Sequence, residues 1–142
     1  MSDLLEQQSA LLEFYGEPVS VYTRSQAIDD GYLIDLTETA RGMGFKVPVA
    51  ITSDAFVRCV HLEKEDAKIL GVTESLRVAR LLRVLLFNIR NTMSGCEGRC
   101  TFELTFQAVN SDRVVEDRAM IESTIGPGDD GEPVITIKHL KG

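Results

Sequence analysis

The chain has 142 residues, a length that predicts a single domain over 1–142 with a substantial core. Its formal net charge of -7 argues against general affinity for nucleic acid, because phosphate binding depends on clustered Lys and Arg. No apolar run approaches the roughly 20 residues of a membrane-spanning helix, and no signal-peptide pattern is found, so we expect a cytoplasmic protein with no membrane partner. The three cysteines are an odd number, which favours reduced thiols over a disulfide framework.

The first predicted element is an amphipathic helix over residues 3–15. Apolar side chains recur there at a spacing of three to four residues, which places them on one helical face: Leu4, Leu5, Leu11, Leu12 and Tyr15. Such a helix either packs on its own domain or contacts a partner, and the sequence leaves both alternatives open.

Residues 23–52 carry the densest local structural signals of the chain. Thr23 and Gln26 have the spacing of a capping box, which predicts a short helix over 25–30 that Gly31 ends in a left-handed conformation. A strand over 32–36, a helix from Thr37 and a second strand over 47–51 follow. Pro48 has no backbone N–H to donate, which predicts an edge position for that second strand.

The longest predicted helix covers residues 75–93. One or two helices precede it over 53–70, Gly71 ends them, Thr73 caps the long helix and Gly95 ends it. At 100° per residue, one arc of this helix is apolar: Val78, Leu81, Leu82, Leu85, Leu86, Ile89 and Met93. We expect that arc to face the core.

Three strands are predicted after the long helix. Phe102, Leu104, Phe106 and Ala108 alternate with polar residues, the period-two pattern of a strand with one buried face. A turn at 110–112, a strand over 114–125, a loop over 126–131 and a strand over 134–139 complete the chain. The sequence therefore predicts an α+β fold: N-terminal helices with short strands, and one long central amphipathic helix packed on a C-terminal antiparallel three-stranded meander.

Motifs for metal binding or catalysis are weak. Cys59, His61, Cys96 and Cys100 lack the paired spacing of a structural zinc site, and nothing in the sequence activates a cysteine as a nucleophile. Gly128-Asp129-Asp130 is better explained as a hairpin loop than as a metal-binding turn. We therefore predict no metal, no cofactor and no catalytic residues, and an enzymatic function is the least supported hypothesis.

Functional content is concentrated on the polar arc of the long helix. Residues 71–100 hold five bases and two acids in an otherwise acidic chain. The polar arc comprises Arg77, Arg80, Arg83 and Arg90, and Val84 and Phe87 fall among them. The arginines either pair with acids of the chain itself or bind a ligand. Because apolar residues framed by Arg are typical of protein interfaces, we predict contact with a protein partner or a homodimer. The alternative is an anionic small molecule or nucleic acid.

Two segments resemble the signature of an uncharacterised family of small proteins carried by bacterial phages, plasmids and integrative elements. The similarity follows the patterns YTRxQAIxDG and FKxPVAxT within residues 15–58 and GPGDDGEPVITI within residues 126–138. This resemblance implies a mobile genetic element as the setting and implies no catalytic residues. Since accessory genes of such elements often encode inhibitors of host defence systems, inhibition of a host defence system is one form of the predicted protein-binding function.

Overall fold

The computed structural model describes residues 22–91 and 98–141, and it has the α+β fold that the sequence predicts. The predicted helix over 3–15, Met93, Gly95 and Cys96 lie outside the described residues. The elements are α2 (Arg24–Asp29), β1 (Leu33–Asp35), α3 (Thr37–Gly42), β2 (Val49–Thr52), α4 (Ser53–Cys59), α5 (Lys64–Leu70), α6 (Glu74–Asn91), β3 (Arg99–Asn110), β4 (Arg113–Pro127) and β5 (Pro133–Leu140). In the described ranges, no helix has the length and apolarity needed to cross a membrane.

All five strands of the described chain form one sheet in the order β1-β2-β5-β4-β3. The antiparallel meander β3-β4-β5 is confirmed, and β2 joins it by pairing parallel to β5. The predicted edge position for the strand with Pro48 is wrong, because β2 lies between β1 and β5. Pro48 lies just before β2, so its lack of an N–H removes no hydrogen bond from the sheet. Its carbonyl accepts from the Ile135 N–H at 2.8 Å.

Local helix signals near the N-terminal signature are confirmed. Thr23 Oγ1 accepts from the Gln26 N–H at 3.0 Å, and Gln26 Oε1 accepts from the Thr23 N–H at 2.9 Å, which completes the capping box of α2. Gly31 follows this helix with a φ of 83°, a conformation that a residue with a Cβ rarely adopts. Thr73 caps α6 by accepting from the Leu76 N–H at 3.2 Å.

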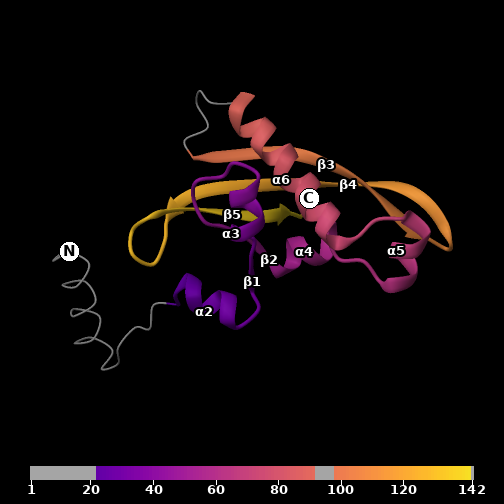
Figure 1. The fold of residues 1–142 in the computed structure, drawn as a ribbon, viewed down its shortest axis with the longest axis horizontal. Helices are drawn as coiled ribbons and strands as arrows, with labels where there is room; N and C mark the ends of the chain where they lie inside the picture. The colour runs from indigo at the N-terminus through magenta and orange to yellow at the C-terminus, as the bar shows by residue number, and fades with distance from the viewer. Residues whose placement is uncertain (1–21, 92–97, 142) are drawn as a thin grey trace.

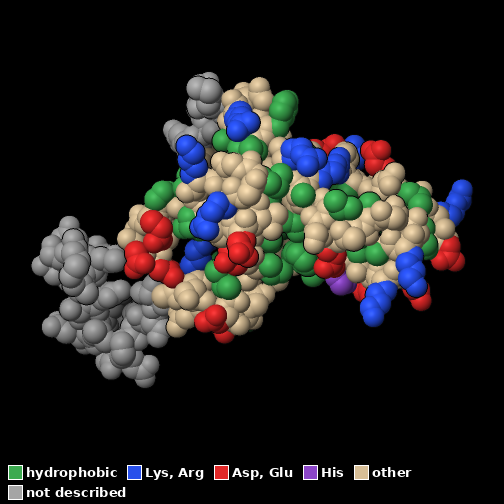
Figure 2. Space-filling view, viewed as in Figure 1, with side chains coloured by type: hydrophobic (Ala, Val, Ile, Leu, Met, Phe, Trp, Pro, Cys, Tyr) green, Lys and Arg blue, Asp and Glu red, His purple; other side chains and the backbone are tan. Residues whose placement is uncertain are grey.

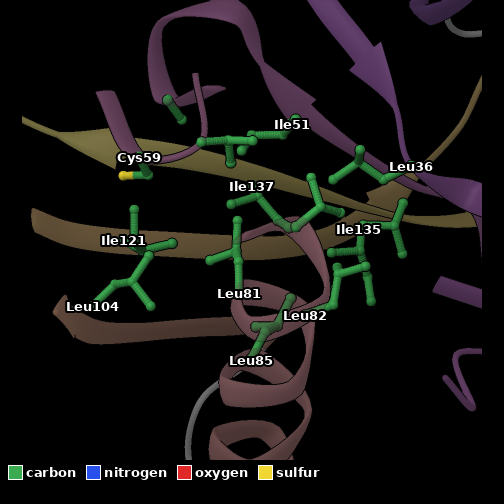
Figure 3. Packing of buried hydrophobic residues seen from close by; sticks show 14 of the residues in the cluster. Leu36, Ile51, Cys59, Leu81, Leu82, Leu85, Leu104, Ile121, Ile135 and Ile137 are labelled. Atoms are coloured by element: carbon green, nitrogen blue, oxygen red, sulfur yellow. The ribbon is translucent and has the colours of Figure 1, made fainter. Parts of the chain in front are cut away.

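The core lies between the sheet and the apolar arc of α6. Figure 3 shows Leu81, Leu82 and Leu85 pointing from α6 toward isoleucines of β4 and β5, and all three are fully buried. Leu86 and Ile89 pack against the same cluster with partial burial. The predicted face of β3 is buried at Phe102, Leu104 and Phe106, while Ala108 is only half-buried. Burial of each large side chain contributes roughly 1.5–3 kcal/mol.

The strand β3 forms one edge of the sheet, and α6 crosses it obliquely (Figure 1). The Ile125 N–H donates to the Gly98 carbonyl at 2.7 Å, and the antiparallel register from Arg99 to Asn110 follows from there. Because hydrogen-bonded pairs alternate along an antiparallel ladder, the carbonyls of Thr105 and Gln107 point away from β4, toward the free edge. These carbonyls lie within reach of the side chains of α6.

Candidate functional site

The predicted arginine arc of α6 divides into two halves. In the N-terminal half, Arg77 donates to the carbonyls of Gln107 and, at 3.4 Å, Cys59. Its guanidinium also lies 5.4 Å from the centre of the Phe106 ring. Arg80 donates to the carbonyl of Thr105. These two arginines therefore satisfy edge carbonyls of β3, a contact that also blunts the edge against pairing with other strands.

The C-terminal half of the arc presents an aromatic side chain to solvent. Phe87 is 66% exposed, and Arg83 and Arg90, which are also exposed, lie four residues before it and three residues after it. That spacing places both arginines beside Phe87 on the helix surface. Val84, which the sequence groups with Phe87, is instead half-buried and packs against the core. We define Arg83, Phe87 and Arg90 as the outer face of α6.

The outer face has no acidic partner among the residues that the structure describes. The ion pairs of the described chain involve other bases, such as Arg58 with Asp117 at 2.9 Å and Lys138 with Glu122 at 3.1 Å. Arg77 and Arg80 bond to backbone carbonyls and leave the acids of the chain unused. The described residues therefore give no support to internal pairing between the α6 arginines and acids.

A groove of about 400 Å³ lies between the N-terminal half of α6 and the β3–β4 hairpin. Its lining combines two guanidiniums with apolar side chains and one carboxylate: Val72, Leu76, Arg77, Arg80, Thr105, Phe106, Gln107 and Glu116. The two guanidiniums make this groove a candidate place for an anionic ligand. Both guanidiniums already donate to β3 carbonyls, and Glu116 would repel an anion, so the groove is a poor anion site.

Three of the four residues considered as metal ligands, Cys59, His61 and Cys100, lie in the described part of the chain. Burial raises the pKa of the Cys59 thiol to about 11, so this thiol stays protonated near neutral pH. His61 is exposed and bonds Glu63 at 3.1 Å and Glu74 at 2.9 Å, contacts that raise its pKa. Cys100 is buried in the core. Across residues 22–91 and 98–141, no group of three or more His, Cys, Asp and Glu side chains is arranged to hold a metal ion.

One constellation was missed by sequence reasoning, and it joins the two signature segments. The Asp129 carboxylate accepts from the backbone N–H groups of Arg24 at 2.8 Å and Ser25 at 3.0 Å. The Arg24 guanidinium donates to Thr136 Oγ1 at 2.6 Å and to the Ile135 carbonyl at 2.7 Å. We call these five residues the signature corner. Each segment contains a clear local signal, but the contact spans more than 100 positions and no local pattern reveals it.

The position of Gly128, in the second segment, leaves little room for a side chain. A Cβ at this position would lie 1.7 Å from Glu132 Oε1 and 2.9 Å from a methyl group of Val134. The Gly128 N–H also donates to the Glu132 carbonyl at 2.6 Å, which closes the loop between β4 and β5. The loop thereby holds Asp129 against the start of α2, so the Gly-Asp-Asp sequence has a structural role, as predicted for a hairpin loop.

The fold defines the class: a small α+β protein with a mixed five-stranded sheet, in which hydrogen bonds join α2 to β5 and to the loop before it. The chain belongs to a family of unknown function, DUF6573, whose model matches residues 13–140. Searches among curated proteins and among solved structures gave no match. The membership confirms the resemblance to an uncharacterised family, and carriage by mobile genetic elements stays a prediction.

Proposed function

We propose that this chain is a protein-binding protein of a mobile genetic element and that the outer face of α6 is its contact surface. The observation that carries the proposal is the exposure of Phe87, at 66%, between the exposed Arg83 and Arg90 on α6. We place its action in the cytoplasm, where thiols such as that of Cys59 stay reduced. Inhibition of a host defence system is one form that this binding would take.

The composition of the outer face supports a protein partner over a small ligand. Aromatic and Arg side chains are enriched among the residues that dominate interface energetics, and burial of an aromatic side chain removes roughly 150–250 Å² from water. The outer face is convex, since Phe87 projects from a helix, whereas small molecules prefer concave sites. A convex aromatic residue flanked by two cations fits an acidic surface that has an apolar depression.

The alternative function, binding of an anionic small molecule or nucleic acid, rests on the other half of the arginine arc of α6. Its support is limited to the N–H donors of Arg77 and Arg80 that remain beyond those bound to β3, since Glu116 in the same groove opposes an anion. Phosphate contacts would make binding fall steeply with salt concentration, whereas burial of Phe87 would resist salt. The two candidate functions therefore differ in the steepness of the salt dependence, because the flanking arginines make the protein contact partly salt-dependent as well.

Photocrosslinking in cells tests the proposed function. A photoreactive aromatic amino acid would replace Phe87 in one variant and Val57, which is 65% exposed on α4, in a matched control. We expect a discrete protein adduct from position 87, no equivalent adduct from position 57, and loss of the adduct when Arg83→Glu is added. The proposal fails if both positions give the same adducts, or if position 87 crosslinks only to nucleic acid or to nothing.

A further inference from the structure

We propose that the outer face of α6 binds a second copy of this chain, at an acid-rimmed pocket beside the signature corner. The inference rests on the proposed function, because it names the partner of the same face. Figure 2 shows acidic side chains around the end of the molecule where the loop between β4 and β5 lies, and basic side chains over α6. The two surfaces have opposite charge, and each copy carries both.

Charge repulsion disfavours a contact between two outer faces. A twofold interface would bring the same patch of both copies together, so Arg83 and Arg90 of one copy would approach the same arginines of the other. The outer face contains no acid to offset that repulsion, and like charges brought together in an interface cost several kcal/mol. The charge argument therefore favours a different partner surface, and an acidic one.

The pocket has the complementary chemistry. It has a volume of about 420 Å³ and is lined by apolar side chains, Ile28, Pro48 and Val134, and by five acids, Asp29, Asp35, Asp129, Asp130 and Glu132, together with Arg24, Ser25 and Thr37. Its one base, Arg24, donates to Thr136 and Ile135 and so is engaged inside its own chain. The pocket therefore offers an apolar lining with a net negative rim.

Three of the five acids are available to a partner. The carboxylate of Asp129 is bonded to the start of α2, and that of Asp35 to Thr37 at 3.0 Å. Asp29, Asp130 and Glu132 are exposed, and none of them forms an ion pair within the described parts of the chain. An incoming guanidinium would give these carboxylates a charge-assisted partner.

The dimensions of the two surfaces agree. The pocket has room for a side chain of the size of phenylalanine, and its apolar lining is the part that Phe87 of the second copy would contact. Arg83 and Arg90 are seven residues apart, which separates them by about 10 Å along the helix axis. One guanidinium therefore lies on each side of Phe87 along the helix, where each can approach a carboxylate of the rim.

This contact is head-to-tail, because it joins two different surfaces. Each copy that binds through its outer face still has a free acidic pocket, and each copy that binds through its pocket still has a free outer face. Heterologous contacts of this kind produce closed rings or open filaments, whereas a twofold contact stops at a dimer. The assembly is therefore expected to grow with protein concentration.

Mixing of two variants tests the inference by sedimentation velocity. The head variant, Arg83→Glu with Phe87→Ser, has a damaged outer face, and the tail variant, Asp130→Lys with Glu132→Lys, has a damaged pocket. We expect the full-length wild type to form dimers and larger species, and each variant alone to stay monomeric. An equal mixture should form a heterodimer and nothing larger, because only the pocket of the head variant and the outer face of the tail variant remain intact.

The control for the mixing experiment is the thermal midpoint of each variant, which shows whether the tail variant folds. If Asp130→Lys with Glu132→Lys unfolds, Asp29→Lys replaces it, since a cation is favoured near the C-terminus of α2. A wild type that stays monomeric up to about 1 mM, well above a micromolar dissociation constant, overturns the second-copy inference. In that case, crosslinking at position 87 still decides the proposed function. A wild type that associates while the mixture stays monomeric also overturns the inference, because the contact then lies elsewhere.

Discussion

The signature corner and the outer face of α6 use the same residue type in opposite ways. In the corner, the Arg24 guanidinium bonds a hydroxyl and a carbonyl of β5, and its backbone N–H bonds Asp129. On the outer face, Arg90 is exposed and has no ion-pair partner in the described chain. The role of an arginine in this protein therefore depends on its contacts. Arg24 joins two segments that are distant in sequence, whereas Arg90 is available to contact another molecule.

The largest expected effect on stability comes from a matched pair of substitutions across this comparison. Arg24→Met should lower the free energy of unfolding by about 2 kcal/mol, since it removes charge-assisted bonds to Thr136 and Ile135 from a half-buried position. Arg90→Met should change it by less than about 0.5 kcal/mol, because the side chain is exposed. Urea denaturation measures both. Equal effects from the two substitutions would remove the distinction between the two regions.

A somewhat smaller loss is expected at Gly31, which ends the helix of the signature corner. Gly31→Val should lower the free energy of unfolding by at least ~1 kcal/mol, because a β-branched residue is strained at positive φ. Gly42→Ala is the control: its backbone is not in the positive-φ region, and an added Cβ meets nothing within 4 Å. Unchanged denaturant midpoints in the Gly31 variant would contradict the assigned helix end.

The capping box of α2 gives the next effect in size. Thr23→Ala should cost about 1 kcal/mol through loss of the hydroxyl that accepts from the Gln26 N–H. Thr23→Ser keeps an acceptor at the same place and should recover most of that stability. If the alanine and serine variants have the same denaturation midpoint, the hydrogen bond to the hydroxyl does not stabilise the protein.

Local sequence signals predicted most of the helices and strands. The features that they did not predict depend on contacts between residues far apart in the sequence. The capping box, the left-handed glycine, the buried arc of α6 and the alternation of β3 each depend on neighbours within a few positions, so the sequence displays them. The parallel pairing of β2 with β5 joins residues about 86 positions apart, for example Val49 with Ile135, and no periodicity encodes it. The same limit explains the wrong edge position for the strand that follows Pro48.

The candidate site was predicted in part for the same reason. The structure contains the predicted helix α6. Its helical geometry places five residues of the candidate site on one side: Arg77, Arg80, Arg83, Phe87 and Arg90. The sequence could not show that the Gln107 and Thr105 carbonyls at the sheet edge would take up Arg77 and Arg80, because that depends on where α6 crosses β3. Nor could it show that Val84 would reach the core. The open surface is consequently smaller than predicted.

A pH dependence is expected where α6 begins, at the end opposite its exposed half. His61 bonds Glu63 and Glu74, and these contacts raise its pKa. Because the folded-state pKa is higher than the unfolded value of about 6.5, the stabilisation is fully present below that value and is lost as pH rises through the folded-state pKa. His61→Gln should flatten the change in thermal midpoint across this pH range. An unchanged pH profile in the variant would show that the two carboxylates do not stabilise the protonated ring.

The smallest effect on stability, and the largest on binding, is expected on the outer face itself. Phe87→Ser with Arg83→Glu should leave the thermal midpoint nearly unchanged, because Phe87 is 66% exposed and Arg83 is exposed as well. Self-association or partner binding should be lost, since the double substitution removes the aromatic anchor and reverses one flanking charge.

Leu86→Ser is the matched control at the neighbouring position. Leu86 packs against the core, so this substitution should lower the thermal midpoint by several degrees. A double variant that unfolds would show that Phe87 is covered within its own chain, and one that binds normally would place the interface elsewhere. The contrast between adjacent residues 86 and 87 thus measures where the core ends and the binding surface begins.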